Sequence, residues 1–183
     1  QVHAERRSRY TTAIEQLSND KASIRLGGVY ALIGLADEWL ADKYGFRQEG
    51  QIIINNLCAY IRSSFALAFH YDELTQDSPT AEGLYKNREQ EFYIHKAELQ
   101  AEADVRLSIL KEIHARLQGP DKNTPGAWSN FEYDFSGSTF FYPVDLTRSY
   151  YKKPVHFSES VYRSSANFSG STYQDEVRFG GST

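Results

Sequence analysis

The chain has no methionine, one cysteine and only five prolines among its 183 residues. A single cysteine, Cys58, excludes a disulfide within the chain and is typical of a reducing compartment. No run of about 18 apolar residues occurs, so we expect no membrane span in this stretch, and no secretory leader is recognisable. The net charge of −4 predicts no general attraction to nucleic acid or to an anionic membrane.

The sequence also lacks the residue clusters that enzymes and metalloproteins use. The five histidines do not pair at metal-ligand spacing; they are His3, His70, His95, His114 and His156. No GxGxxG or GxxxxGK(S/T) motif is present. Cys58 lies on an apolar helix face, which indicates a small buried hydrophobe and not a nucleophile. We therefore expect no catalytic, cofactor or metal site and assign the chain to the non-enzymatic proteins.

What the sequence does contain is a short period in its last third. The large residues of this part form two series with a spacing of 11 residues, the second five residues behind the first. In chain order the nine predicted repeat centres are Phe135, Phe140, Leu146, Tyr151, Phe157, Tyr162, Phe168, Tyr173 and Phe179. A serine stands two residues before each member of the second series, and Val, Ala or Tyr two before each member of the first. A fixed short period of this kind is typical of a solenoid.

The composition of the repeat favours strands over a helical supercoil. An 11-residue period also fits a right-handed coiled coil, but this stretch is rich in Ser, Gly, Thr, Tyr, Phe and Val and contains Pro143 and Pro154. Four-sided coils, each made of two such periods, explain the spacing, with the large residues pointing inward. Phe135 is then expected under Phe157 and Phe179, Leu146 under Phe168, Phe140 under Tyr162, and Tyr151 under Tyr173.

The segments Val155-His156-Phe157-Ser158-Glu159 and Ala166-Asn167-Phe168-Ser169-Gly170 resemble the unit A-(D/N)-(L/F)-x-x of the bacterial pentapeptide-repeat family, in its Phe-centred variant. The resemblance covers residues 131–183 and implies a right-handed quadrilateral β-helix. The sequence departs from the simplest family pattern by one extra residue in every second repeat, which puts the regularity of the corners in question.

The preceding residues predict α-helices over 1–20, 21–40, 50–70 and 88–118, with a long connection over 71–87. Ile24-Arg25-Leu26-Gly27-Gly28-Val29-Tyr30-Ala31-Leu32 resembles the second helix of HEAT-type repeats, and an echo, Val105-Arg106-Leu107, follows in the last of these helices. The small residues around Gly27 and Gly28 predict close approach of a neighbouring helix. We interpret the run Arg6-Arg7-Ser8-Arg9 as a solvated helix face, or else as the juxtamembrane end of a helix. The acidic residues Glu89, Glu91, Glu98, Glu102 and Asp104 are also expected on a solvated face.

The predicted fold class is α+β in two parts. A HEAT-like helical domain over 1–119 is followed by a Pro/Gly linker and cap over 120–130 and by the β-helix over 131–183. Trp128 and Phe131 are expected to plug the first coil. Because no methionine begins the chain and Ser182-Thr183 repeats Ser171-Thr172, we expect a fragment whose solenoid continues.

Three functions compete on these grounds. The first is a protein-interaction scaffold with an unidentified protein partner and no nucleic acid, cytoplasmic and located at the inner face of a membrane through an anchor upstream. The second follows from the resemblance, since some family members mimic DNA and bind type II topoisomerases. That role needs an acidic solenoid, whereas residues 131–183 carry six acids and five bases. The third, an enzyme, is disfavoured by the absence of a reactive cluster.

Overall fold

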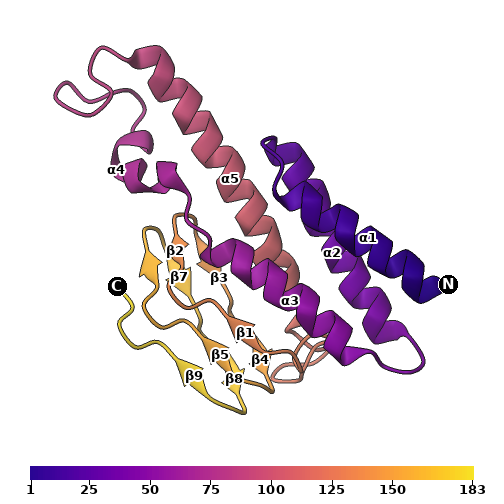
Figure 1. Cartoon of the computed structure of the whole chain (residues 1–183). Coiled ribbons are helices and arrows are strands. Elements are labelled where there is room, and N and C mark those ends of the chain that lie inside the picture. Colours follow the sequence, from indigo (N-terminus) through magenta and orange to yellow (C-terminus); the bar gives the residue numbers. More distant parts are fainter.

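The computed structural model describes residues 1–183, with helices in the first part and short parallel strands in the last (Figure 1). The helical elements are α1 (Val2–Leu17), α2 (Ala22–Ala41), α3 (Arg47–Arg62), η1 (Ala66–His70), α4 (Tyr71–Leu74) and α5 (Glu89–Arg116). The strands are β1 (Tyr133–Asp134), β2 (Thr139–Phe140), β3 (Val144–Asp145), β4 (Tyr150–Tyr151), β5 (Val155–His156), β6 (Val161–Tyr162), β7 (Ala166–Asn167), β8 (Thr172–Tyr173) and β9 (Val177–Arg178). The molecule is thus a mixed helix and strand protein.

The strands pair only with partners two periods away along the chain, and every pair is parallel. Tyr133 lies opposite Val155, Thr139 opposite Val161, Val144 opposite Ala166, and Tyr150 opposite Thr172. This gives four small stacked sheets, β1-β5-β9, β2-β6, β3-β7 and β4-β8. The register predicted from the repeat spacing is confirmed.

Seven of the nine predicted repeat centres form three ring stacks, and the fourth side of the strand stack has Leu146 and Phe168 instead. The Phe135 ring lies 5.3 Å from that of Phe157, which lies 5.0 Å from that of Phe179. Phe140 stacks on Tyr162 and Tyr151 on Tyr173 at 5.0 and 5.1 Å. The first five centres, Phe135 to Phe157, are buried, whereas Phe179 is 38% exposed. Phe179 is more exposed because it lies on the outermost strand turn, farthest from α3 and α5 (Figure 1), with a stacked ring on one side only.

Every second corner of the coils has a left-handed backbone, so these corners recur with the period of the repeat. The positive φ angles belong to Gly137, Arg148, Glu159, Gly170 and Gly181, between 53° and 73°. L-residues with a side chain seldom adopt this conformation, and three of the five positions are glycine. These corners all lie in the five-residue intervals, such as that between Phe135 and Phe140, so the extra residue of the six-residue intervals falls at the other corners.

The helices follow the predicted ranges except at the end of the third, and the short helix α4 lies in the stretch predicted as a connection. The pattern predicts a helix over 50–70, but α3 ends at Arg62 and the chain continues into η1. The guanidinium of Arg106 on α5 binds the carbonyls of Ile61 and Ser63 at 3.1 and 2.9 Å. These carbonyls at the end of α3 are therefore satisfied by a side chain from another helix.

By length and composition alone, the stretch Arg47–Leu74 could cross a membrane, with a mean hydropathy of 1.4 over its most apolar window. The same properties occur in core helices of proteins that do not span membranes. Here the stretch is interrupted after Arg62, and Ile53, Ile54 and Leu57 on α3 are fully buried.

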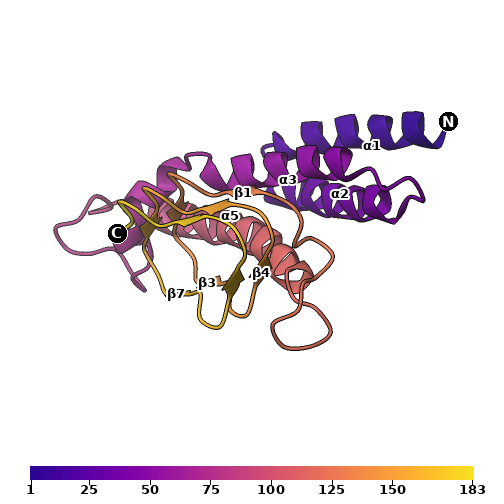
Figure 2. The ribbon, with the colours of Figure 1, turned by 90° about the horizontal axis from the view of Figure 1, so that it is seen from below.

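The helices and the strands share one continuous hydrophobic core. A single cluster of 35 buried residues runs from Ala13 on α1 to Phe157 on the second coil. The segment 120–130 belongs to this junction, since Trp128 and Phe131 are both buried. The Phe131 ring lies against Gly50, where a Cβ atom would come within 2.7 Å of it. In a second view α1, α2 and α3 lie beside the strands and α5 crosses behind them (Figure 2).

Candidate functional site

The free edge of the first coil is covered by side chains of α3. Three successive outward carbonyls of the coil accept hydrogen bonds: Asn130 from Arg47, Glu132 from Gln51 and Asp134 from Arg62. The Gln51 side chain also accepts from the Glu132 amide at 2.8 Å, so it pairs with the backbone as a neighbouring strand would. An uncovered strand edge invites pairing with another chain, and α3 prevents this at β1.

Two other sides of the first coil are covered as well. On the β3 side, His114 and Gln118 at the end of α5 bind the carbonyl of Thr147. On the β4 side, the amides of Tyr150 and Lys152 donate to the carbonyls of Leu117 and Ser129. The helical part and the segment after it therefore act together as a cap on the strand stack.

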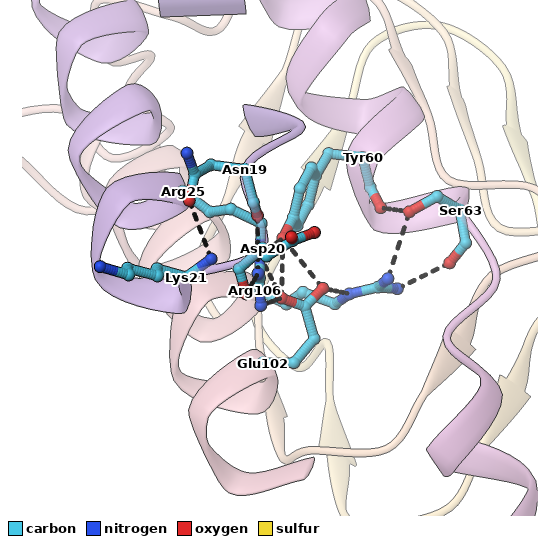
Figure 3. Close-up of polar contacts among 8 residues, drawn as sticks. All are labelled: Asn19, Asp20, Lys21, Arg25, Tyr60, Ser63, Glu102 and Arg106. Carbon is cyan, nitrogen blue, oxygen red and sulfur yellow. Dashed lines mark hydrogen bonds and ion pairs between the residues drawn. The ribbon is translucent and has the colours of Figure 1, made fainter. Parts of the chain in front are cut away.

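A buried polar cluster lies where α2, α3 and α5 meet (Figure 3). Its centre is Glu102 on α5, which is 3% exposed and accepts from Arg106 at 2.9 Å, from Arg25 at 3.1 Å and from the Tyr60 phenol at 2.7 Å. Burial, and then the hydrogen bond to Glu102, raises the pKa of Tyr60. The carboxylate thus has two positive partners and one neutral donor, as a buried charge requires.

The cluster also holds chain segments together. Arg25 donates to the carbonyls of Asn19 and Asp20, which follow α1. Arg106 donates to the carbonyls of Ile61 and Ser63 at the end of α3. The two arginines occupy the same position in the similar segments Ile24-Arg25-Leu26 and Val105-Arg106-Leu107, and both bind Glu102. The prediction that Glu102 lies on a solvated face is wrong, because the helix turns this residue towards both arginines.

Two further expectations about single residues have clear outcomes. Cys58 is 1% exposed among apolar neighbours, and burial raises the pKa of its thiol to about 12, so the small buried hydrophobe is confirmed. Arg6 does not lie on a solvated face as predicted. Its side chain is 13% exposed, lies over the Trp39 ring and binds Asp42 at 2.9 Å.

The small-residue face of α2 is used only in part. At Gly28 a Cβ atom would come within 2.8 Å of the Ala13 carbonyl on α1, so the close approach is real at that position. At Gly27 and Gly34 no atom lies within 4 Å of such a Cβ, and the prediction is wrong there. Gly28 alone among these three accounts for the packing of α1 on α2.

Of the nine repeat centres, the first five are buried in the strand stack, the next three are half-buried and Phe179 is exposed. No set of three or more His, Cys, Asp or Glu side chains comes together to hold a metal ion. Comparison with known proteins finds no family model that matches the chain and no significant match among curated proteins or solved structures.

Proposed function

We propose that residues 131–183 form a right-handed quadrilateral β-helix of the pentapeptide-repeat type and that residues 1–119 form a HEAT-like helical domain that caps it. The β-helix is supported by the return of the chain to the same position after every two periods and by the four parallel ladders. The HEAT-like arrangement is supported by the equivalent positions of Arg25 and Arg106 around Glu102.

The proposed role of this assembly is a non-enzymatic scaffold that binds another protein. The observation that carries the proposal is the continuous core, because it joins two repeat-like parts into one rigid surface. Apolar side chains remain exposed on that surface at the start of α5 and just before it. Leu84, Tyr93 and Ile94 are 45%, 44% and 51% exposed. Tyr93 and Ile94 are adjacent on α5, and exposed apolar groups that lie together are typical of protein-binding surfaces.

The experiment is affinity capture with the whole chain as bait. Three forms are compared: the unchanged chain, the double variant Tyr93→Ala/Ile94→Ala, and the control Tyr44→Ala, which removes a 71% exposed tyrosine at another place. We expect one protein to be retained by the unchanged chain and the control and lost by the double variant. Equal retention by all three forms, or no specific retention, would contradict the proposal.

DNA mimicry has less support. Three of the six acids in residues 131–183 are already engaged within the chain: Asp134 lies 3.7 Å from Arg62, Glu176 2.6 Å from Arg178, and Asp145 accepts from Thr147. A mimic of DNA needs a continuous row of free negative charges, as the phosphates of a duplex provide. Specific capture of a type II topoisomerase in the same experiment would favour DNA mimicry over the general scaffold role.

A further inference from the structure

A cavity of about 290 Å³ lies between the end of α3, η1 and the first two coils. Three arginines from different parts of the chain line it: Arg62 on α3, Arg106 on α5 and Arg163 after β6. No aspartate or glutamate lines it, and the rest of the wall consists of hydroxyl and apolar groups such as Ser64, Thr139, Phe65 and Phe141. The cavity therefore combines positive charge with an apolar wall.

The backbone of β2 contributes polar groups to the same cavity. The carbonyls of Ser138 and Phe140 accept from Val161 and Arg163 of the next coil. Backbone groups of successive strand residues point to opposite edges, so the amide and carbonyl of Thr139 point away from β6. No strand pairs with β2 on that edge, and none of the α3 or α5 side chains that cover the neighbouring edges binds there. Thr139 lines the cavity with these groups unused.

Two of the arginines retain capacity to bind an anion. Arg62 donates through Nη1 to the Asp134 carbonyl, and its Nε and Nη2 make no hydrogen bond within the chain. Arg106 is buried and engaged by Glu102, Ile61, Ser63 and the Ser63 hydroxyl, with the Tyr142 hydroxyl beside its remaining N–H group. Arg163 binds only Asp72, at 3.1 Å, and the Asp72 side chain is 84% exposed. A surface ion pair of this kind contributes little and is readily exchanged for another anion.

We propose that this cavity binds a carboxylate with an apolar body, either a free organic acid or the C-terminal residue of a peptide. The carboxylate binds Arg163 and Arg62, because a guanidinium matches the geometry of a carboxylate. The apolar body lies against Phe65 and Phe141, and the Thr139 backbone pairs with an amide of a peptide ligand. The site is independent of the scaffold role, since its residues are not those of the Tyr93 surface.

The test is a titration of the ¹⁵N-labelled whole chain followed by amide chemical shifts. The ligands are phenylacetate, its neutral analogue phenylacetamide, N-acetyl-glycyl-phenylalanine with a free carboxylate, and the same dipeptide as an amide. We expect saturable shifts at Ser64, Gly137 and Thr139 with at least one acid, and binding at least about tenfold weaker for its neutral analogue. Arg163→Gln and Arg62→Gln each raise the Kd about tenfold, while Arg7→Gln, an equal charge loss on the exposed face of α1, leaves it unchanged.

The outcomes separate the two sources of the carboxylate. Binding of phenylacetate alone assigns the site to free organic acids, and binding of the dipeptide acid alone assigns it to peptide C-termini. Binding of both phenylacetate and the dipeptide acid supports the site and means that its apolar wall accepts either body. Absence of saturable shifts with either acid, or an equal effect of Arg163→Gln and Arg7→Gln, overturns the proposal. Unchanged shifts elsewhere in the variants show that they remain folded.

Discussion

At the scale of single residues, the buried carboxylate of Glu102 has three hydrogen-bond donors, and two of them carry a positive charge. Arg106 and Arg25 provide positive charge, and the Tyr60 hydroxyl donates a further hydrogen bond. Arg106 and Glu102 are each 2–3% exposed, so water cannot replace either partner. The removal of one member of a buried pair leaves an uncompensated charge, which is far more destabilising than the loss of a surface pair.

We therefore expect Glu102→Gln to lower the free energy of unfolding by about 3 kcal/mol. The amide keeps the shape of the side chain but leaves Arg106 buried without a counter-charge. The control is Glu98→Gln, an exposed residue one turn earlier on the same face of α5, which we expect to change stability by less than about 0.5 kcal/mol. Urea unfolding of both variants measures the difference, and equal midpoints would mean that Glu102 is not the centre of the cluster.

The left-handed corners allow a second prediction from a pair of glycines. A Cβ atom at Gly137 or at Gly27 would meet no atom within 4 Å, so packing does not distinguish the two positions. Gly137 has a φ of 68°, whereas Gly27 lies within α2. Gly137→Ala is expected to destabilise the fold by about 1 kcal/mol because of backbone strain. Gly27→Ala is expected to stabilise it by about 0.5–1 kcal/mol. Thermal unfolding checks both signs, and a stabilising Gly137→Ala would contradict the left-handed corner.

Not every residue could be placed from the sequence. The regular spacing of the large residues was sufficient to place the repeat centres, because each contact is set by a fixed offset. The left-handed positions share that offset and could have been found through Gly137, Gly170 and Gly181. The burial of Glu102 could not, because it depends on Arg25, which is 77 residues away and lies on a different helix.

At the scale of the elements, the ring stacks are the main apolar contact between successive coils. Phe157 is fully buried between Phe135 and Phe179, whereas Phe179 has a ring on one side only and is 38% exposed. We expect Phe157→Ala to lower the free energy of unfolding by about 3–5 kcal/mol. The matched variant Phe179→Ala removes the same atoms from the outer coil and should lose less than half as much. Similar losses, measured by chemical unfolding, would mean that the coils do not form a graded stack.

The tyrosines of the junction and coils predict how stability depends on alkaline pH. Burial raises the pKa of Tyr162 to about 12 and raises those of Tyr133, Tyr142 and Tyr151 further. In the unfolded chain these phenols lose their protons near pH 10. Between about pH 10 and pH 12 the folded state binds more protons than the unfolded state, so stability falls as pH rises. The part of the tyrosinate absorbance at 295 nm that comes from these buried tyrosines should therefore appear only together with unfolding, and titration of all tyrosines near pH 10 in the folded protein would contradict this.

The helices and strands differ in how far their ends and their pairing can be predicted from the local sequence. The strands are two residues long, and their pairing follows from the repeat, so their register was predictable. The end of α3 was not predictable from its own apolar pattern, which continues beyond Arg62. It depends on Arg106, which lies on α5, far along the chain, and binds the carbonyls of Ile61 and Ser63.

At the scale of the whole molecule, the composition change near Gly119 marks a change of structure but not an interruption of the core. The hydrophobic cluster continues from the helices into the coils, and α3 and α5 supply the bonds that cover the first coil. A boundary in sequence composition reports the local conformation, whereas independent folding depends on which surfaces are buried. The prediction of two separate parts therefore needs a direct test.

We expect a chain shortened to residues 1–119 not to fold cooperatively. Without the coils, Phe65 would lose the stacked ring of Phe141, and Gly50 on α3 would lose the Phe131 ring that lies against it. Far-UV circular dichroism should still show helix, while the near-UV signal and a sharp thermal transition should be lost. The matched control ends at residue 165, which removes the outer part of the strand stack and keeps the first coil that contacts the helices. It should retain a cooperative transition, and a sharp transition of residues 1–119 alone would show that the helical part is an independent domain.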